Sequence, residues 1–337
     1  MDVLVCSAPG ELKLERRPVP RPRAGDALVK PRRIGVCGTD YHIYEGRHPY
    51  LQYPRVMGHE LCVEVVEAPA RSGFAPGDVC IVNPYLACGR CVACRAGKPN
   101  CCVEVSVLGV HQDGGMCECL SLPAANLLRA PGLTEDQCAA VEFLAIGAHA
   151  ARRAAAAAGD RALVIGAGPI GIGVAIFARL SGAAVAVHDR DAARARAAEA
   201  LTGATALQAC GDPRAASLEF TGGDGFDVVF DATGNARSME AGFDFVAHGG
   251  RLVFVSVVRE LITFADAEFH RKEMTLLATR NATGGDFERV IDAMRRGQVP
   301  VDRLITHRTT LAGAVDDIPR WAVAKSGLIK ALIEVGD

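Results

Sequence analysis

The sequence predicts an α/β protein with two domains, one irregular and mostly β, the other a doubly wound parallel sheet. The sequence changes character near residue 140, and the part before it is rich in proline, glycine and cysteine. After it, short β-branched runs alternate with helical stretches, which is typical of parallel strands covered by helices on both faces. A length of 337 residues also suits two domains.

The elements of each part follow from local patterns. Turn-forming residues bound the apolar runs 56–68 and 77–85, which predicts strands in the first domain. In the second domain the predicted order is strand 161–166, helix 169–182, strand 184–189, helix 191–203 and later strands 226–234, 251–256 and 275–280. The alanine-rich run 148–158 is predicted to be a helix that Gly159 ends.

Composition excludes several classes of partner. The net charge is −2, so the chain has no basic excess for nucleic acid or anionic membranes. The N-terminus meets charges after a few apolar residues and is not expected to be a signal peptide. Uncharged apolar runs stay below the roughly 18 residues that a membrane helix needs. We expect a cytoplasmic protein, because a reducing compartment suits free thiols and thiolate metal sites.

Cysteine is the most unusual part of the composition. There are 13 cysteines, and all but Cys210 lie at or before Cys138. An odd, front-loaded set does not fit a disulfide framework and indicates metal binding in the first domain. Four of them have the spacing of a closed tetrahedral zinc site, namely Cys88, Cys91, Cys94 and Cys102. Cys101 could replace Cys102, and a disulfide cluster is the other interpretation.

A second group could form an open metal site. Cys37 lies in GVCGTDYH, and His59 and Glu60 lie in GHE. A cysteine, a histidine and a glutamate from separate segments leave a position for water or substrate. The plain alternative is a buried Cys37 that only packs, with His59 as a core histidine.

A glycine-rich turn predicts a dinucleotide site. Residues 166–171 read GAGPIG, between a predicted strand and a predicted helix. Gly166 permits the tight turn, Gly168 lets the backbone approach a pyrophosphate, and Gly171 lets helix and strand pack closely. Pro169 and Ile170 open the helix, whose N-terminus favours phosphate.

Asp189 follows the second strand, about 20 residues after that turn, where an acid can bind ribose hydroxyls. Its charge repels a 2′-phosphate, so NAD is favoured over NADP. The neighbouring Arg190 could stack on adenine or partly tolerate a phosphate. A glycine turn that binds nothing is the alternative.

Together these motifs resemble the zinc-dependent medium-chain dehydrogenase family, which includes alcohol, sorbitol and threonine dehydrogenases. The resemblance covers essentially the whole chain. It implies a GroES-like β domain split around a Rossmann domain. The expected bounds are 1–141 with 285–337 for the GroES-like catalytic domain, about 85–104 for its zinc lobe, and 142–284 for the NAD-binding domain.

The resemblance also implies an alcohol dehydrogenase with two zinc ions per chain, one catalytic and one structural. Cys37, His59, Glu60 and Glu142 would surround the catalytic zinc, and Glu142 would ligate it directly or through water. Asp40 would orient His59, while Cys138 is a less favoured ligand. Thr39 and His42 would pass the substrate proton to water. Lys330 would lie near the pyrophosphate, with a surface position as the alternative.

Several segments look closest to the bacterial sugar-acid branch, whose members oxidise aldonates such as L-gulonate or L-galactonate at C5. A sugar acid needs a cation for its carboxylate, and Arg280 and Arg47 are candidates, with Tyr44 and His111 as pocket residues. A sorbitol-type or threonine-type dehydrogenase is the main rival. A zinc-free reductase of the superfamily and a regulatory protein on this fold are further alternatives. We expect a homodimer or homotetramer, built by pairing of Rossmann sheets.

Overall fold

The chain forms two compact units. The computed structural model describes residues 1–47, 51–207, 213–324 and 327–336, so Cys210 lies outside the described residues. The first unit contains residues 1–142 and 283–337, and the second contains residues 143–282. None of the described helices is long and apolar enough to cross a bilayer.

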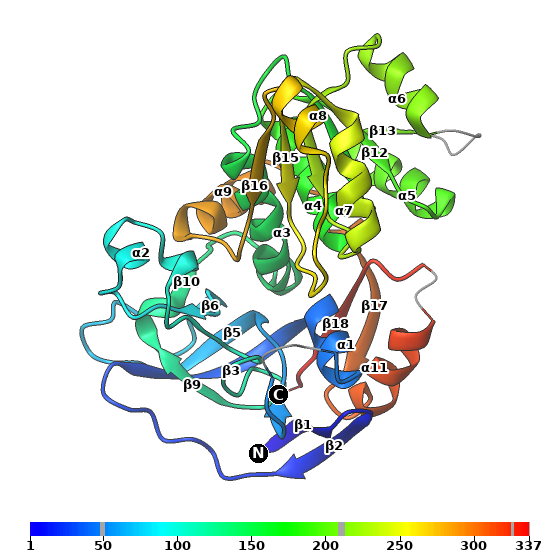
Figure 1. Cartoon of the computed structure of the whole chain (residues 1–337). Helices are drawn as coiled ribbons and strands as arrows, with labels where there is room; N and C mark the ends of the chain where they lie inside the picture. The colour runs from blue at the N-terminus through cyan, green and yellow to red at the C-terminus, as the bar shows by residue number, and fades with distance from the viewer. Residues whose placement is uncertain (48–50, 208–212, 325–326, 337) are drawn as a thin grey trace. The chain divides into compact units, whose positions relative to one another are not determined.

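The main sheet of the first unit joins segments from both ends of the chain. Its strands are β3 (Asp26–Val36), β5 (Glu60–Glu67), β6 (Val79–Val82), β9 (Leu120–Pro123), β10 (Leu127–Arg129), β17 (Ile305–Thr310) and β18 (Lys330–Glu334). The order is β10-β6-β5-β3-β18-β17, and β9 also pairs with β3. Strand β18 lies antiparallel to β3, with Ala331 opposite Val36 (Figure 1). This pairing brings Lys330 to the end of β3, beside the Val36 carbonyl.

Smaller elements complete the first unit. Two further sheets contain β1 (Asp2–Ala8), β2 (Glu11–Arg16) and β4 (Arg55–Val56), and then β7 (Tyr85–Leu86) and β8 (Ser106–Val107). The helices are α1 (Gly38–Tyr44), α2 (Val92–Arg95), η1 (Pro99–Cys101), η2 (Ala124–Asn126), α9 (Gly284–Arg295), α10 (Val301–Leu304) and α11 (Ala314–Val323). Helix α3 (Glu135–Arg153) runs from the first unit into the second.

The second unit has one parallel sheet. Its strands are β11 (Arg161–Ile165), β12 (Ala184–His188), β13 (Thr205–Ala206), β14 (Phe226–Asp231), β15 (Val246–Phe254) and β16 (Thr275–Ala278), in the order β13-β12-β11-β14-β15-β16. Its helices are α4 (Pro169–Leu180), α5 (Ala192–Thr202), α6 (Pro213–Thr221), α7 (Ala236–Gly242), η3 (Phe243–Phe245) and α8 (Asp266–Arg271). The predicted fold class is therefore confirmed.

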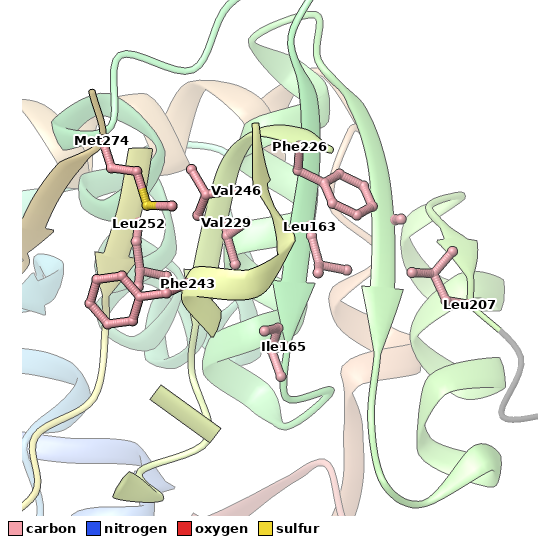
Figure 2. Packing of buried hydrophobic residues seen from close by; sticks show 10 residues of the cluster. Leu163, Ile165, Leu207, Phe226, Val229, Phe243, Val246, Leu252 and Met274 are labelled. Atoms are coloured by element: carbon pink, nitrogen blue, oxygen red, sulfur yellow. The ribbon is translucent and has the colours of Figure 1, made fainter. Parts of the chain in front are cut away.

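The core of the second unit lies on this sheet. Leu163, Val229 and Leu252 come from three adjacent strands and are almost completely buried. Figure 2 shows them beside Phe226 and Phe243, in one continuous layer. Burial of each such side chain stabilises the fold by about 1.5–3 kcal/mol. Buried on both faces, the strands need continuous apolar runs, which is why the sequence pattern predicts them.

The bounds predicted for one helix were wrong at both ends. The alanine-rich run was expected to be a helix over 148–158 with Gly159 as its end, but α3 begins at Glu135 and ends at Arg153. Ala155 adopts a left-handed conformation with φ 52°, which a helix cannot continue through. Acidic residues in the first turn and Arg152 and Arg153 in the last turn match the helix dipole at the observed ends.

Candidate metal and cofactor sites

Three side chains of the first unit converge on one point. Cys37 follows β3 and precedes α1, His59 directly precedes β5, and Glu60 is the first residue of β5. Strands β3 and β5 are antiparallel neighbours, and their register places Gly35 opposite Glu60. One ligand atom from each of Cys37, His59 and Glu60 lies within 4.8 Å of the others. Such a set of sulfur, nitrogen and oxygen donors suits zinc.

The state of His59 supports a metal at this point. The side chain is buried, and its Nδ1 has no hydrogen-bond partner among the described residues. An unsatisfied buried nitrogen is costly to a fold, and a bound cation nearby would offset part of that cost. Burial alone lowers the pKa of His59, but the charges of Cys37, Asp40 and Glu142 outweigh it and raise that pKa well above its usual value. The pocket therefore attracts positive charge.

Asp40, which the sequence predicts to orient His59, lies beside the imidazole ring without a hydrogen bond to it. The nearest atoms, His59 Nδ1 and Asp40 Oδ1, are 3.9 Å apart, which is too long for such a bond. Instead, the Asp40 carboxylate accepts the backbone N–H groups of Cys37 at 2.8 Å and Gly58 at 3.4 Å. Asp40 therefore holds together the backbone segments of Cys37 and His59, because one N–H group of each segment donates to its carboxylate.

Lys330 is not a surface residue, so that alternative for it was wrong. Its side chain is only 2% exposed, and Nζ donates to Glu60 Oε1 at 2.7 Å and Oε2 at 2.8 Å. A third bond, of 3.3 Å, goes to the Val36 carbonyl. The Lys330 ammonium is thus bound by Glu60, one of the three candidate metal ligands of the first unit.

Glu142 lies near the same group without belonging to it. It is a buried residue of α3, and the Tyr85 hydroxyl donates a hydrogen bond to its Oε1. Burial raises the pKa of Glu142 to about 7, with the Glu60 charge acting in the same direction and His59 against it. Tyr85 was missed from sequence; its only signal was its place at the end of a predicted strand.

The residues expected to carry the proton lie on or beside α1. Thr39 is half-buried, and its Oγ1 lies 3.7 Å from the Cys37 sulfur. His42 is exposed in the last turn of the helix. Thr39 is thus next to the metal candidates and His42 next to water.

Three of the candidate substrate residues lie in the first unit, and Arg280 lies in the second. Tyr44 is half-buried at the end of α1, and the exposed Arg47 pairs with Glu45. His111 is exposed, and its Nδ1 accepts the Val107 N–H at 3.1 Å. Arg280 is exposed after β16, in the second unit. Exposure leaves the arginines accessible, while His111 has one ring nitrogen engaged.

The second metal candidate is the cysteine lobe. The sulfurs of Cys88, Cys91, Cys94 and Cys102 all lie within 4.8 Å of one another. The Cys91 sulfur is 3.5 Å from that of Cys94 and 3.9 Å from that of Cys102. Backbone N–H groups of Cys94 and Val103 lower the pKa of Cys91 to about 6. Cys101 is exposed and lies outside the group.

The glycine-rich turn joins β11 to α4 in the second unit. Gly166 has φ 100°, and Gly168 caps the helix ahead of Pro169. A Cβ on Gly171 would lie 1.8 Å from the Gly166 carbonyl oxygen, so close packing requires glycine there. A Cβ on Gly168 would meet nothing within 4 Å. The protein itself therefore leaves space beside Gly168, while Ile170 continues the first helical turn.

Asp189 closes the same turn from the end of β12. Its Oδ2 accepts the Ala167 N–H at 2.8 Å, and its Oδ1 accepts the Asp191 N–H at 2.9 Å. Each carboxylate oxygen keeps a second lone pair for a further donor. Arg190 is exposed beside it. The carboxylate is thus held in place by the backbone, next to the helix N-terminus.

Comparisons with known proteins agree on one family. The model of the alcohol dehydrogenase GroES-like domain matches residues 23–132, and that of zinc-binding dehydrogenases matches residues 169–296. L-Galactonate-5-dehydrogenase of Escherichia coli K12 is 41% identical over 99% of this chain and 98% of its own. The 2-dehydro-3-deoxy-L-galactonate 5-dehydrogenase of Pseudoalteromonas atlantica is 30% identical over 93% of this chain and 92% of its own.

A solved structure of an alcohol dehydrogenase is also similar to this chain. The RspB alcohol dehydrogenase of E. coli CFT073, complexed with NADH, superposes with a TM-score of 0.92. It is 28% identical, and the match covers 99% of both chains.

Proposed function

The chain belongs to the zinc-binding alcohol dehydrogenase family, and on this premise we propose that it oxidises a secondary alcohol of a sugar acid with NAD, as an aldonate 5-dehydrogenase. The observation that carries the proposal is the full-length similarity to L-galactonate-5-dehydrogenase, together with the convergence of Cys37, His59 and Glu60. The product is a ketone.

Two zinc ions per chain fit the donor sets. Cys37, His59 and Glu60 would hold the first, with Glu142 as a direct ligand or through water, and their mixed sulfur, nitrogen and oxygen donors support this. When bound there, zinc supplies a Lewis acid that makes the substrate hydroxyl more acidic. The four lobe cysteines would hold the second, which is structural because four thiolates close the coordination shell.

The chain's own residues orient the substrate and move its proton. Thr39 accepts the proton of the substrate hydroxyl while it donates its own hydroxyl proton onward, since its hydroxyl lies beside the Cys37 sulfur. The exposed His42 then passes the proton to water, a role that suits an imidazole near neutral pH. Tyr85 holds the Glu142 carboxylate in place.

NAD is the proposed cofactor, and when bound it would supply the acceptor for the hydride. The N-terminus of α4 and the space beside Gly168 favour a pyrophosphate. The free lone pairs of Asp189 suit ribose hydroxyls and disfavour the 2′-phosphate of NADP. Arg190 is exposed and free to stack on the adenine ring.

The substrate is a small molecule, and its carboxylate requires a cation. Arg280 and Arg47 are the proposed candidates, with Tyr44 and His111 as further pocket residues. A neutral polyol or an amino alcohol is the second candidate, because it would need the same metal and cofactor residues. The names of the two sugar-acid relatives favour the sugar acid.

The proposal is tested by NAD and NADP reduction with L-galactonate, L-gulonate, sorbitol and threonine. We expect turnover of an aldonate with NAD, and a Cys37→Ser variant without activity that keeps its lobe zinc. Turnover of sorbitol or threonine alone would contradict the substrate. Activity in the Cys37→Ser variant would contradict the mechanism.

We also propose a homodimer or homotetramer. Strand β16 is the last strand of its sheet, so one row of its backbone groups is open to a further strand. Val257 and Leu261, in the segment between β15 and α8, are 80% and 88% exposed. Exposed apolar residues and an open sheet edge in the same unit suit a second copy of the chain.

A further inference from the structure

The Lys330–Glu60 pair crosses the middle of three adjacent strands. Lys330 begins β18, Glu60 begins β5, and β3 lies between them with Gly35 opposite Glu60. A Cβ on Gly35 would be 2.0 Å from Glu60 Oε2. The absence of a side chain at Gly35 is therefore what allows the carboxylate to lie over β3 and reach the ammonium.

A buried ion pair of this kind is costly as a structural device. Removing two charges from water costs several kcal/mol per ion, and apolar residues of similar size often stabilise a fold as well or better. Both partners here are at most 2% exposed, and the pair adjoins Cys37 and His59. This placement suggests that the pair serves the site.

Charge at the site explains what the lysine does. Cys37, Glu60 and Glu142 can together supply three negative charges, which exceeds the charge of one divalent ion. Lys330 has both Glu60 oxygens within 2.8 Å, while one ligand oxygen of Glu60 also lies within 4.8 Å of the Cys37 and His59 ligand atoms. With a metal ion bound, one carboxylate would face two cations.

We propose that Lys330 is a positioning residue that competes with the catalytic metal for the Glu60 carboxylate and so weakens Glu60 as a ligand. The inference rests on the proposed function, because it assumes a metal between Cys37 and His59. A metal that receives less charge from Glu60 keeps more of its own positive charge. That is the property a Lewis acid needs.

The test compares Lys330→Met, Lys330→Arg, Glu60→Gln and the double variant Lys330→Met/Glu60→Gln. Chelator competition measures how tightly active-site zinc is held, with lobe zinc as an internal reference. Cobalt substitution reports the ligand set through its visible spectrum. Steady-state kinetics separate kcat from KM.

Lys330→Met should hold active-site zinc about ten- to a hundred-fold more tightly, because a buried cation is lost and Glu60 is released. Its cobalt spectrum should change, and kcat should fall more than KM for NAD rises. Arginine should restore zinc affinity, spectrum and kcat. In the Glu60→Gln background, the lysine substitution should leave the cobalt spectrum unchanged.

Unchanged or weaker zinc binding in a folded Lys330→Met protein would overturn the inference. If that variant does not fold, Glu60→Gln decides: its cobalt spectrum should resemble wild type, and a large change would show that Glu60 is already a full ligand. Absence of aldonate turnover in the wild type would refute the proposed function instead, since zinc and cobalt binding can still be measured.

Discussion

At the scale of single residues, the glycine-rich turn separates two needs for glycine. Gly171 must lack a side chain because the Gly166 carbonyl occupies that space. Gly168 has no such neighbour within the described part of the chain, since a Cβ there would meet nothing within 4 Å. Gly171 is needed for packing, whereas Gly168 leaves room for a ligand.

Gly168→Ala should therefore keep the stability of the protein while raising the Kd for NAD at least about ten-fold, because the new methyl group takes the space of the pyrophosphate. Gly171→Ala should instead lower the free energy of unfolding by about 2 kcal/mol or more through overpacking. Urea unfolding and calorimetric NAD titration measure the two effects. Normal NAD affinity in a folded Gly168→Ala protein would contradict the assigned role.

At the scale of elements, the start of α3 is tied to two strands by charge. Arg33 of β3 bonds Asp136 at 3.2 Å and Glu135 at 3.0 Å, and Arg308 of β17 also pairs with Asp136. The hydrogen bonds from Arg308 hold the pKa of Asp136 below its usual value, against the effect of partial burial. The helix that carries Glu142 is thereby fixed to the sheet that contains β3 and β17.

This contact should give a stability term that depends on pH. Since the pKa of Asp136 is lower in the folded state, the term is present above the unfolded value of about 3.9 and is lost as pH falls through the folded pKa. Asp136→Asn should cost about 1 kcal/mol at pH 7 and little at pH 3. Urea unfolding across this range measures it, with the exposed Asp302→Asn as control. An equal loss at both pH values would argue against the ion pairs.

The cysteine lobe allows a matched pair of variants. Cys94→Ser should lose one zinc per chain, because three thiolates hold zinc less tightly than four, and should make the lobe sensitive to protease. Cys101→Ser, next to a lobe ligand but exposed, should keep both zinc ions. Zinc analysis by mass spectrometry distinguishes them. Loss of zinc in Cys101→Ser would exchange the roles of Cys101 and Cys102.

At the scale of the whole molecule, the open edge of the second unit predicts assembly. Val257→Lys combined with Leu261→Lys should yield a monomer, because two charges on each copy would repel across an apolar contact. Light scattering after size-exclusion chromatography measures the mass. Leu218→Lys, a change at a residue 52% exposed in α6, is the control and should leave the assembly intact. A persistent dimer in the double variant would place the interface elsewhere.

Structural features that depend on neighbouring residues could be predicted from the sequence, whereas contacts between distant residues could not. The strands and the glycine turn could be predicted because each sequence pattern spans only a few residues. The same is true of the lobe cysteines, whose spacing is short. The partner of Lys330 could not, since Glu60 is 270 residues away and only strand pairing joins them. Tyr85 and Glu142 meet in the same way, through folding alone. The helix predicted from the alanine-rich run had the wrong bounds, because composition does not determine where a helix ends.

The split of the first unit has a consequence for biosynthesis. Strand β3 needs β18, and Lys330 and the Val36 carbonyl that it contacts lie 294 residues apart. All of the second unit leaves the ribosome between them, so that unit can fold first while β3 waits for its neighbour. Until Lys330 emerges, the Glu60 carboxylate has no counterion from that strand. We therefore expect the cysteine lobe to acquire its ion early in synthesis and the Cys37 site to mature last.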